Sequence, residues 1–200
     1  MADHVTTPTT HARTRRPLIL ASASPRRQQL LHEAGVPFVT RPVDVDEAPL
    51  PAETPKALVQ RLARAKAEAA DVGPDDIVLA ADTEVAYDGE CFGKPRDLAD
   101  ARRMITRLAG TTHRVHTGVC LRHADTAEVW VCTTEVTFKP LTAADIDHYL
   151  RVSQPLDKAG AYGIQHHADI LLAGYRGSWT NVIGLPIDEV RERLAQHSNL

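Results

Sequence analysis

The residues of this chain that are suited to chemistry form a cationic set, an acidic set and a single amide. They are Arg26, Arg27, Lys66 and Lys94; Glu47 and Asp82; and Gln165. Guanidinium and ammonium groups bind phosphate oxygens, and carboxylates either hold a hard divalent cation or accept a proton. An amide can donate to and accept from the edge of a base. If the fold brings these residues to one cleft, they suit metal-assisted chemistry on a nucleoside triphosphate.

The two arginines close the segment LILASASPRR, whose order predicts a buried strand, a serine turn and the start of a helix. Ser24 suits the N-cap position and Pro25 the first helical position. The backbone N–H groups and the dipole of such a helix start favour a phosphate, and Arg26 and Arg27 add paired donors. The alternative is an ordinary capped surface helix with solvated arginines.

Lys66 falls on the apolar stripe of a predicted helix. Val59, Leu62 and Lys66 are spaced i, i+3 and i+7, so they share one face. We therefore expect the lysine to reach toward the interior or a cleft. The alternative is a lysine whose ammonium group extends from the edge of the stripe into water.

Asp82 follows an unbroken apolar run, Ile77–Ala81, that predicts a strand covered on both faces. A buried carboxylate needs a partner, a metal or an open crevice, and ligands bind α/β sheets at the carboxyl ends of strands. An aspartate that caps a helix or a turn is the alternative. A second acidic group, Glu47, comes just after the end of another extended segment, 38–45.

Two later segments add polar groups. Lys94 lies between Gly93 and Pro95 in a stiff turn, and residues 157–165 contain a charge pair, two glycines that permit close backbone approach, and Gln165.

Composition narrows the class of protein. With 200 residues, 43% of them hydrophobic, we expect one folding unit spanning residues 17–200, preceded by a disordered tail at residues 1–16. A net charge of -3 excludes a generally basic protein that coats nucleic acid. No apolar run approaches the ~20 residues of a membrane span, and there is no signal peptide, so we expect no membrane partner and a cytoplasmic location.

The cysteines and histidines predict neither a disulfide framework nor a zinc site. The three cysteines are odd in number and lack CxxC spacing, so we expect them to be reduced. We interpret His113 and His116 as packed or solvated strand residues, and His166 and His167 face opposite ways if extended.

Strands and helices alternate early and hairpins come later, which predicts an α/β fold with a mixed sheet and flanking helices. The expected strands are 18–20, 38–45, 77–81, one leading to a hairpin at 88–89, 115–122, 129–138 and one around residue 170. One helix is expected to start at residue 25, and the others are expected over 54–70, 99–108, 142–153 and 187–195.

Several motifs, in order, resemble those of the Maf nucleotide pyrophosphatases from about residue 18 to 194. They are SASPRRQQLL, VDE, RLARAKA, AADTEV, FGKPRD, LAGTTHRVHTGV, PLDKAGAYGIQ and NVIGLP. The resemblance implies an elongated, two-lobed fold similar to inosine triphosphatase-like folds, with a central cleft, often as a homodimer. It also implies hydrolysis of a nucleoside triphosphate to the monophosphate and pyrophosphate with a divalent cation, Mg²⁺ or Mn²⁺.

The resemblance also assigns roles. It makes Asp82 the proton acceptor, and it gives phosphate and metal contacts to Ser22, Ser24, Arg27, Glu47, Lys66 and Lys94. We expect Glu47 and Asp82 to hold the cation, directly or through water. In the family, the residue types at Arg26, Thr83 and Gln165 accompany dTTP and UTP as substrates. This chain departs from the pattern at Glu84, where an apolar residue is more usual, and at His166 and His167.

Two other functions fit the same residues. One is a nucleotide-binding regulator of septum formation with little or no catalysis, although a pure binder of a polyanion gains little from Asp82 beside Glu47. The other is a phosphatase that removes the terminal phosphate. Identifying the product separates these alternatives from a pyrophosphatase.

Overall fold

The computed structural model describes residues 17–73 and 75–196, so the predicted tail at 1–16 lies outside the described residues. The strands are β1 (Leu18–Leu20), β2 (Phe38–Thr40), β3 (Ile77–Tyr87), β4 (Glu90–Phe92), β5 (Thr112–His123), β6 (Thr126–Phe138) and β7 (Leu172–Arg176). The α-helices are α1 (Pro25–Glu33), α2 (Pro55–Glu68), α3 (Leu98–Leu108), α4 (Ala143–Val152), α5 (Ala168–Leu171), α6 (Trp179–Ile183) and α7 (Ile187–Gln196). Two 3₁₀ turns, η1 (Pro155–Asp157) and η2 (Ala159–Ala161), lie between α4 and α5.

All seven strands form one mixed sheet in the order β2-β1-β3-β5-β6-β7, with β4 paired to β3. Strand β1 runs parallel to β2 and β3, and the other pairs are antiparallel. The mixed α/β sheet with flanking helices that the sequence predicts is therefore confirmed.

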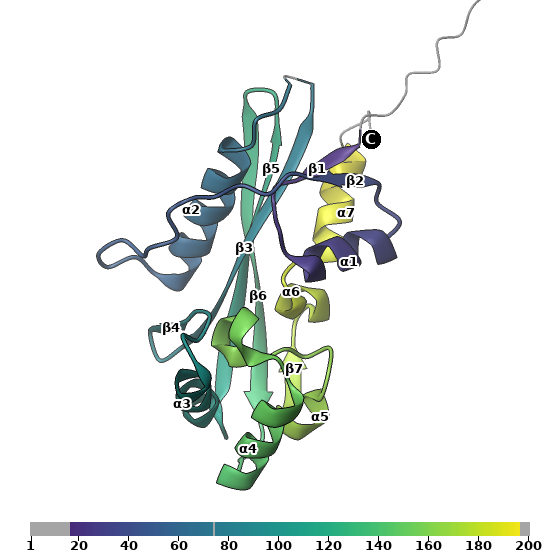
Figure 1. Cartoon of the computed structure of the whole chain (residues 1–200). Helices are drawn as coiled ribbons and strands as arrows, with labels where there is room; N and C mark the ends of the chain where they lie inside the picture. The colour runs from purple at the N-terminus through teal and green to yellow at the C-terminus, as the bar shows by residue number, and fades with distance from the viewer. Residues whose placement is uncertain (1–16, 74, 197–200) are drawn as a thin grey trace, which may run out of the picture.

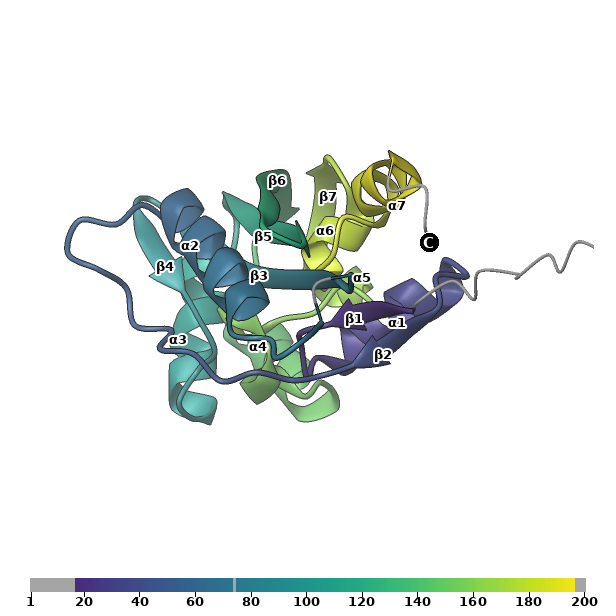
Figure 2. The ribbon, with the colours of Figure 1, turned by 90° about the horizontal axis from the view of Figure 1, so that it is seen from above.

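The molecule is elongated because β3, β5 and β6 run through both of its lobes (Figure 1). In one lobe α2 packs on one face of the sheet, and α1 and α7 pack on the other (Figure 2). In the second lobe α3, α4 and η2 surround a separate apolar cluster that includes Phe92, Phe138 and Tyr149. The two-lobed architecture expected from the resemblance is present.

Strand β3 is longer than the sequence predicts. The apolar run ends at Ala81, but the strand continues through Asp82 to Tyr87 because β5 pairs with it from Ile77 to Ala86. The expectation that Asp82 ends a strand is wrong. The expected hairpin at Asp88 and Gly89 is confirmed, since both residues have positive φ and join β3 to β4.

Side chains at the helix N-termini set where several helices begin. Thr54 and Thr142 cap α2 and α4 through their side chains, and Thr142 forms a capping box with Asp145. Ser24 occupies the N-cap of α1, but its side chain makes no capping hydrogen bond, so its predicted role is only half confirmed. The strand expected around Ile170 is wrong: α5 covers that residue and β7 begins after it.

The histidines in β5 are packed, as the sequence predicts. His113 is buried and its Nε2 lies 2.7 Å from the Tyr162 hydroxyl, while His116 Nδ1 lies 2.9 Å from Thr133 Oγ1. Burial lowers the pKa of each imidazole to about 4. The three cysteines are free thiols. Within the described part of the chain, no helix is long and apolar enough to cross a membrane.

Candidate active site

A cavity of about 470 Å³ lies between the two lobes. It is lined by every residue that was expected to have a role in the site: Ser22, Ser24, Arg26, Arg27, Glu47, Lys66, Asp82, Thr83, Lys94 and Gln165. The expected cleft is therefore present, and it collects residues from segments as far apart as β1 and the loop before α5.

The cavity opens where β3 loses its strand neighbours on one side. Pairing of β1 with β3 ends at Leu79, and β4 pairs with β3 only from Val85 onward. Residues 80–84 thus have β5 on one edge and no paired strand on the other among the described residues. This gap explains why a carboxylate in the middle of a strand, Asp82, still borders open space.

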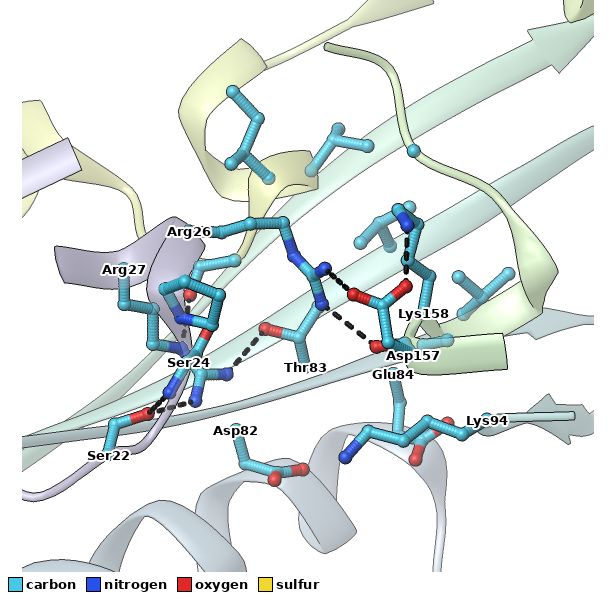
Figure 3. Close-up of a pocket in the computed structure, with 18 of the residues that line it drawn as sticks. Ser22, Ser24, Arg26, Arg27, Asp82, Thr83, Glu84, Lys94, Asp157 and Lys158 are labelled. Carbon is cyan, nitrogen blue, oxygen red and sulfur yellow. Dashed lines mark hydrogen bonds and ion pairs between the residues drawn. The ribbon is translucent and has the colours of Figure 1, made fainter. Parts of the chain in front are cut away.

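Alternation along β3 decides what each side chain meets. Val78 and Ala80 pack in the cluster beneath α2, so Asp82 and Glu84 point to that same face. Thr83 points to the opposite face, toward α1 (Figure 3). One strand therefore presents carboxylates to one side of the cavity and a hydroxyl to the other.

Lys66 joins the two predicted acidic residues. Its Nζ lies 2.6 Å from Asp82 Oδ1 and 2.5 Å from Glu47 Oε1, and only 11% of its side chain is exposed. The prediction that Lys66 reaches into a cleft is confirmed. Burial acts to raise the pKa of Glu47, but the hydrogen bond and charge of Lys66 outweigh it, with help from Lys94 and Arg27, so the pKa is lowered.

Arg27 is a buried cation held entirely by neutral groups. Its Nε donates to the Gly184 carbonyl at 2.9 Å, Nη1 to Ser22 Oγ at 3.1 Å and Nη2 to Thr83 Oγ1 at 3.1 Å. No carboxylate lies within ion-pair distance in the described structure, and burial lowers the pKa of the guanidinium. A buried cation without a counterion favours binding of an anion.

The hydroxyl of Thr83 is part of a chain that fixes Arg27. Besides accepting from Arg27, it lies 3.0 Å from Thr117 Oγ1, which donates to the Asn181 carbonyl at 3.0 Å. Thr117 and Asn181 are fully buried. Thr117, Asn181 and Gly184 were not among the predicted site residues, although Thr117 lies in the motif LAGTTHRVHTGV and the other two lie in NVIGLP.

The start of α1 carries the two predicted serines. Ser22 Oγ accepts from the Ser24 backbone N–H at 3.2 Å and from Arg27, so it orders the turn. Pro25 occupies the first helical turn, as predicted. The two serines thus border the cavity beside a helix N-terminus.

Glu84, a departure from the family pattern, lines the same cavity on the Asp82 face. Its Oε2 is buried without a hydrogen-bond partner. Burial, reinforced by the charges of Asp82 and Glu47, raises the pKa of Glu84 to about 7. Among the described residues that line the cavity, Glu84 carries the buried side-chain oxygen that lacks a hydrogen-bond partner.

The residues expected to select the base come from opposite lobes. Arg26 on α1 bonds to Asp157 on η1, whereas Gln165 belongs to the loop that follows η2. His166 and His167 are exposed and do not line the cavity. From the sequence, Asp157 was expected only as half of a charge pair.

The oxygen donors suit a hard divalent cation. Glu47 and Asp82 converge on Lys66, and the buried Oε2 of Glu84 lacks a partner. In the described residues, however, no three His, Cys, Asp or Glu side chains cluster closely enough to hold a metal by themselves. Mg²⁺ typically takes one or two carboxylates and completes its shell with water and substrate phosphates, so this donor set fits.

A family model and curated relatives each match most of the chain. The profile described as "Maf-like protein" matches residues 17–197. A dTTP/UTP pyrophosphatase of Symbiobacterium thermophilum is 48% identical over 90% of this chain and 93% of its own, and one from Anaeromyxobacter dehalogenans is 50% identical over 86% and 89%. A HAM1 protein from Coxiella burnetii superposes with a TM-score of 0.49 at 15% identity, covering 90% of this chain and 98% of its own. The chain belongs to the Maf family.

Proposed function

We propose that this chain hydrolyses dTTP and UTP to the nucleoside monophosphate and pyrophosphate. The observation that carries the proposal is the meeting, in one cavity, of an acidic pair on Lys66 with a buried arginine that has no counterion. Relatives that share 43–50% of their residues over most of the chain carry the name dTTP/UTP pyrophosphatase, which supports the same substrates.

Arg27, Lys66 and Lys94 bind the triphosphate and neutralise its charge. Asp82 accepts a proton from a water molecule as the water oxygen forms a bond to the α-phosphorus. The bond from that phosphorus to the bridging oxygen breaks, and the oxygen leaves with the electron pair as part of pyrophosphate. A positioned base of this kind contributes about 10² to 10⁴ in rate.

Glu47 and Asp82 are the residues that would hold Mg²⁺ or Mn²⁺, directly or through water. The bound cation supplies neutralisation of the negative charge on the phosphates. Lys66 holds both carboxylates close together before the nucleotide arrives, and its hydrogen bond and charge lower the pKa of Glu47 against the opposing effect of burial.

Arg26, Thr83 and Gln165 are the residues we assign to choice of the base. A buried polar group that a wrong base leaves unpaired costs about 1 to 3 kcal/mol, so two such groups give useful discrimination. In this structure the Thr83 hydroxyl is already engaged by Arg27 and Thr117, which gives Thr83 a second role in positioning the phosphate-binding arginine.

The deciding experiment identifies the products from a panel of canonical and modified triphosphates in the presence of Mg²⁺ or Mn²⁺. We expect pyrophosphate and the monophosphate, with dTTP and UTP ahead of ATP and GTP. Orthophosphate as the first product would indicate removal of the terminal phosphate. Nucleotide binding with no product would favour the regulatory alternative, and equal rates with all nucleotides would contradict the assigned base preference.

We also propose that residues 17–200 act as one catalytic domain, on the ground that β3, β5 and β6 contribute to the apolar clusters of both lobes. A homodimer is proposed from the family resemblance, and the cytoplasmic location stays a prediction from the hydrophobic pattern of the sequence.

A further inference from the structure

Arg26 is held by the opposite lobe. Its Nη1 donates to Asp157 Oδ2 at 2.6 Å and its Nη2 to the Asp157 backbone carbonyl at 3.0 Å, across 131 residues of sequence (Figure 3). Because both bonds end on one residue, they fix the plane of the guanidinium as well as its position.

The second carboxylate oxygen of Asp157 is also occupied. Lys158 Nζ lies 2.5 Å from Asp157 Oδ1 and also donates to the Gln154 carbonyl. Although burial acts to raise the pKa of Asp157, hydrogen bonds from Lys158 and Arg26 lower it. The carboxylate therefore stays ionised and links two cations.

Lys158 in turn fixes the loop that carries Gln165. A Cβ placed on Gly163 would lie 3.0 Å from Lys158 Cδ and from its Cε, so the lysine stem lies directly on this glycine. The Gly163 backbone N–H also donates to the Tyr149 hydroxyl at 3.1 Å. The loop is thus held between α4 and Lys158 just before Gln165.

Charge gives a further reason for the link. Burial is the main cause that lowers the pKa of Arg27, and the positive charge of Arg26 lowers it further, so the adjacent cations oppose each other. Asp157 provides a counterion for Arg26 on the far side of the cavity and leaves Arg27 as the arginine without one. Arg26 is thereby paired with Asp157, while Arg27 stays available to bind an anion.

We propose that Asp157 is a positioning residue for base selection, which sets Arg26 directly and the Gln165 loop through Lys158. This inference rests on the proposed function. It predicts that the Asp157 carboxylate affects discrimination between bases through Arg26, and that it affects the chemical step little.

The test compares Asp157→Asn with the wild type in kcat and KM for dTTP and dATP. We expect the preference for dTTP in kcat/KM to fall about tenfold, the effect of one charge-assisted hydrogen bond, mainly through KM. Arg26→Lys keeps the charge but replaces the planar two-nitrogen fork with a single ammonium nitrogen, so it should lose the same preference. The matched control is Asp88→Asn, which removes another exposed aspartate–arginine pair, with Arg107, outside the cavity.

A double variant shows whether Asp157 acts through Arg26. In an Arg26→Ala background, Asp157→Asn should lose only the smaller part of the preference that acts through Lys158 and the Gln165 loop. An unchanged preference in Asp157→Asn, or the same loss with and without Arg26, would overturn the inference.

Binding separates this inference from the proposed function. If the wild type hydrolyses no triphosphate, the proposed function fails, but calorimetry with α,β-methylene dUTP and α,β-methylene dATP still measures discrimination. A fall in the ratio of the two dissociation constants in Asp157→Asn would support the inference. An unchanged ratio, or a wild type that binds both analogues equally, would overturn it.

Discussion

Gly118 of β5 lies against the backbone of Val59 in α2 so closely that a Cβ on the glycine would be 2.1 Å from the Val59 carbonyl oxygen. Gly118 is also the residue that pairs with Asp82 in the ladder between β3 and β5. The glycine therefore sets how near α2 comes to the sheet at the level of Asp82. This close approach lets Lys66, two turns further along α2, contact Asp82.

Gly118→Ala should displace α2 and weaken the contact between Lys66 and Asp82. Added volume in a packed interior typically costs about 1–3 kcal/mol, and a clash with backbone belongs at the upper end. We expect a clear loss of stability in denaturant unfolding and a fall in turnover of the folded fraction. Gly174→Ala is the matched control, since nothing lies within 4 Å of its added Cβ. Equal stability of the two variants would contradict the packing argument.

Asp82→Asn should lower pyrophosphate release by about 10² to 10⁴, because the amide cannot accept the proton from water. Nucleotide affinity should change much less, since the cationic groups remain. Turnover and calorimetric binding measured side by side check both statements. Asp125→Asn in the exposed turn between β5 and β6 serves as the control. Near wild-type turnover in Asp82→Asn would refute its role as the base.

Arg27→Lys should bind triphosphate at least about tenfold more weakly, because an ammonium group cannot keep all three donor contacts of the guanidinium. The Gly184 carbonyl would lose its buried donor, so stability should also fall by about 1–3 kcal/mol. Steady-state KM and thermal unfolding report the two effects. Arg107→Lys, at an exposed ion pair, should show neither.

Glu84→Gln should make stability less sensitive to pH. In the native chain the pKa of Glu84 is raised to about 7 from 4.5, so the unfolded chain ionises first as the pH rises. The free energy of unfolding therefore falls as the pH rises from about 4.5 to about 7, and it stays low above that range. From about pH 5 to about pH 8, we expect the variant to gain on the order of 2 kcal/mol relative to wild type. Denaturant unfolding of both proteins across this pH range, with a chelator present, measures the gain. If the stabilities of variant and wild type changed with pH in parallel, the prediction would be contradicted.

Two residues of the site could be found from the sequence because each violates a local pattern. Lys66 interrupts an apolar helical stripe, and Asp82 interrupts an apolar strand. These anomalies need only short-range periodicity to be seen, and both residues do line the cavity. The signal for the hairpin at Asp88 is equally local, because two adjacent residues are enough to predict the turn.

The long-range contacts could not be predicted in the same way. Asp82 continues a strand because β5 supplies partners from 36 positions away, as its pairing with Gly118 shows. The bonds from Arg26 to Asp157 and from Arg27 to Gly184 span 131 and 157 residues. No local pattern marks Gly184 as the acceptor for an arginine near the start of the chain.

The sharing of β3 between the lobes has a consequence for how the protein unfolds. Leu79 and Val85 lie on this one strand yet belong to different apolar clusters. Disrupting either cluster frees a strand that the other needs, so neither lobe can melt while leaving its neighbour intact. Calorimetry should then show one transition in which the calorimetric and van't Hoff enthalpies agree. A nucleotide that binds between the lobes should shift this single transition to a higher melting temperature.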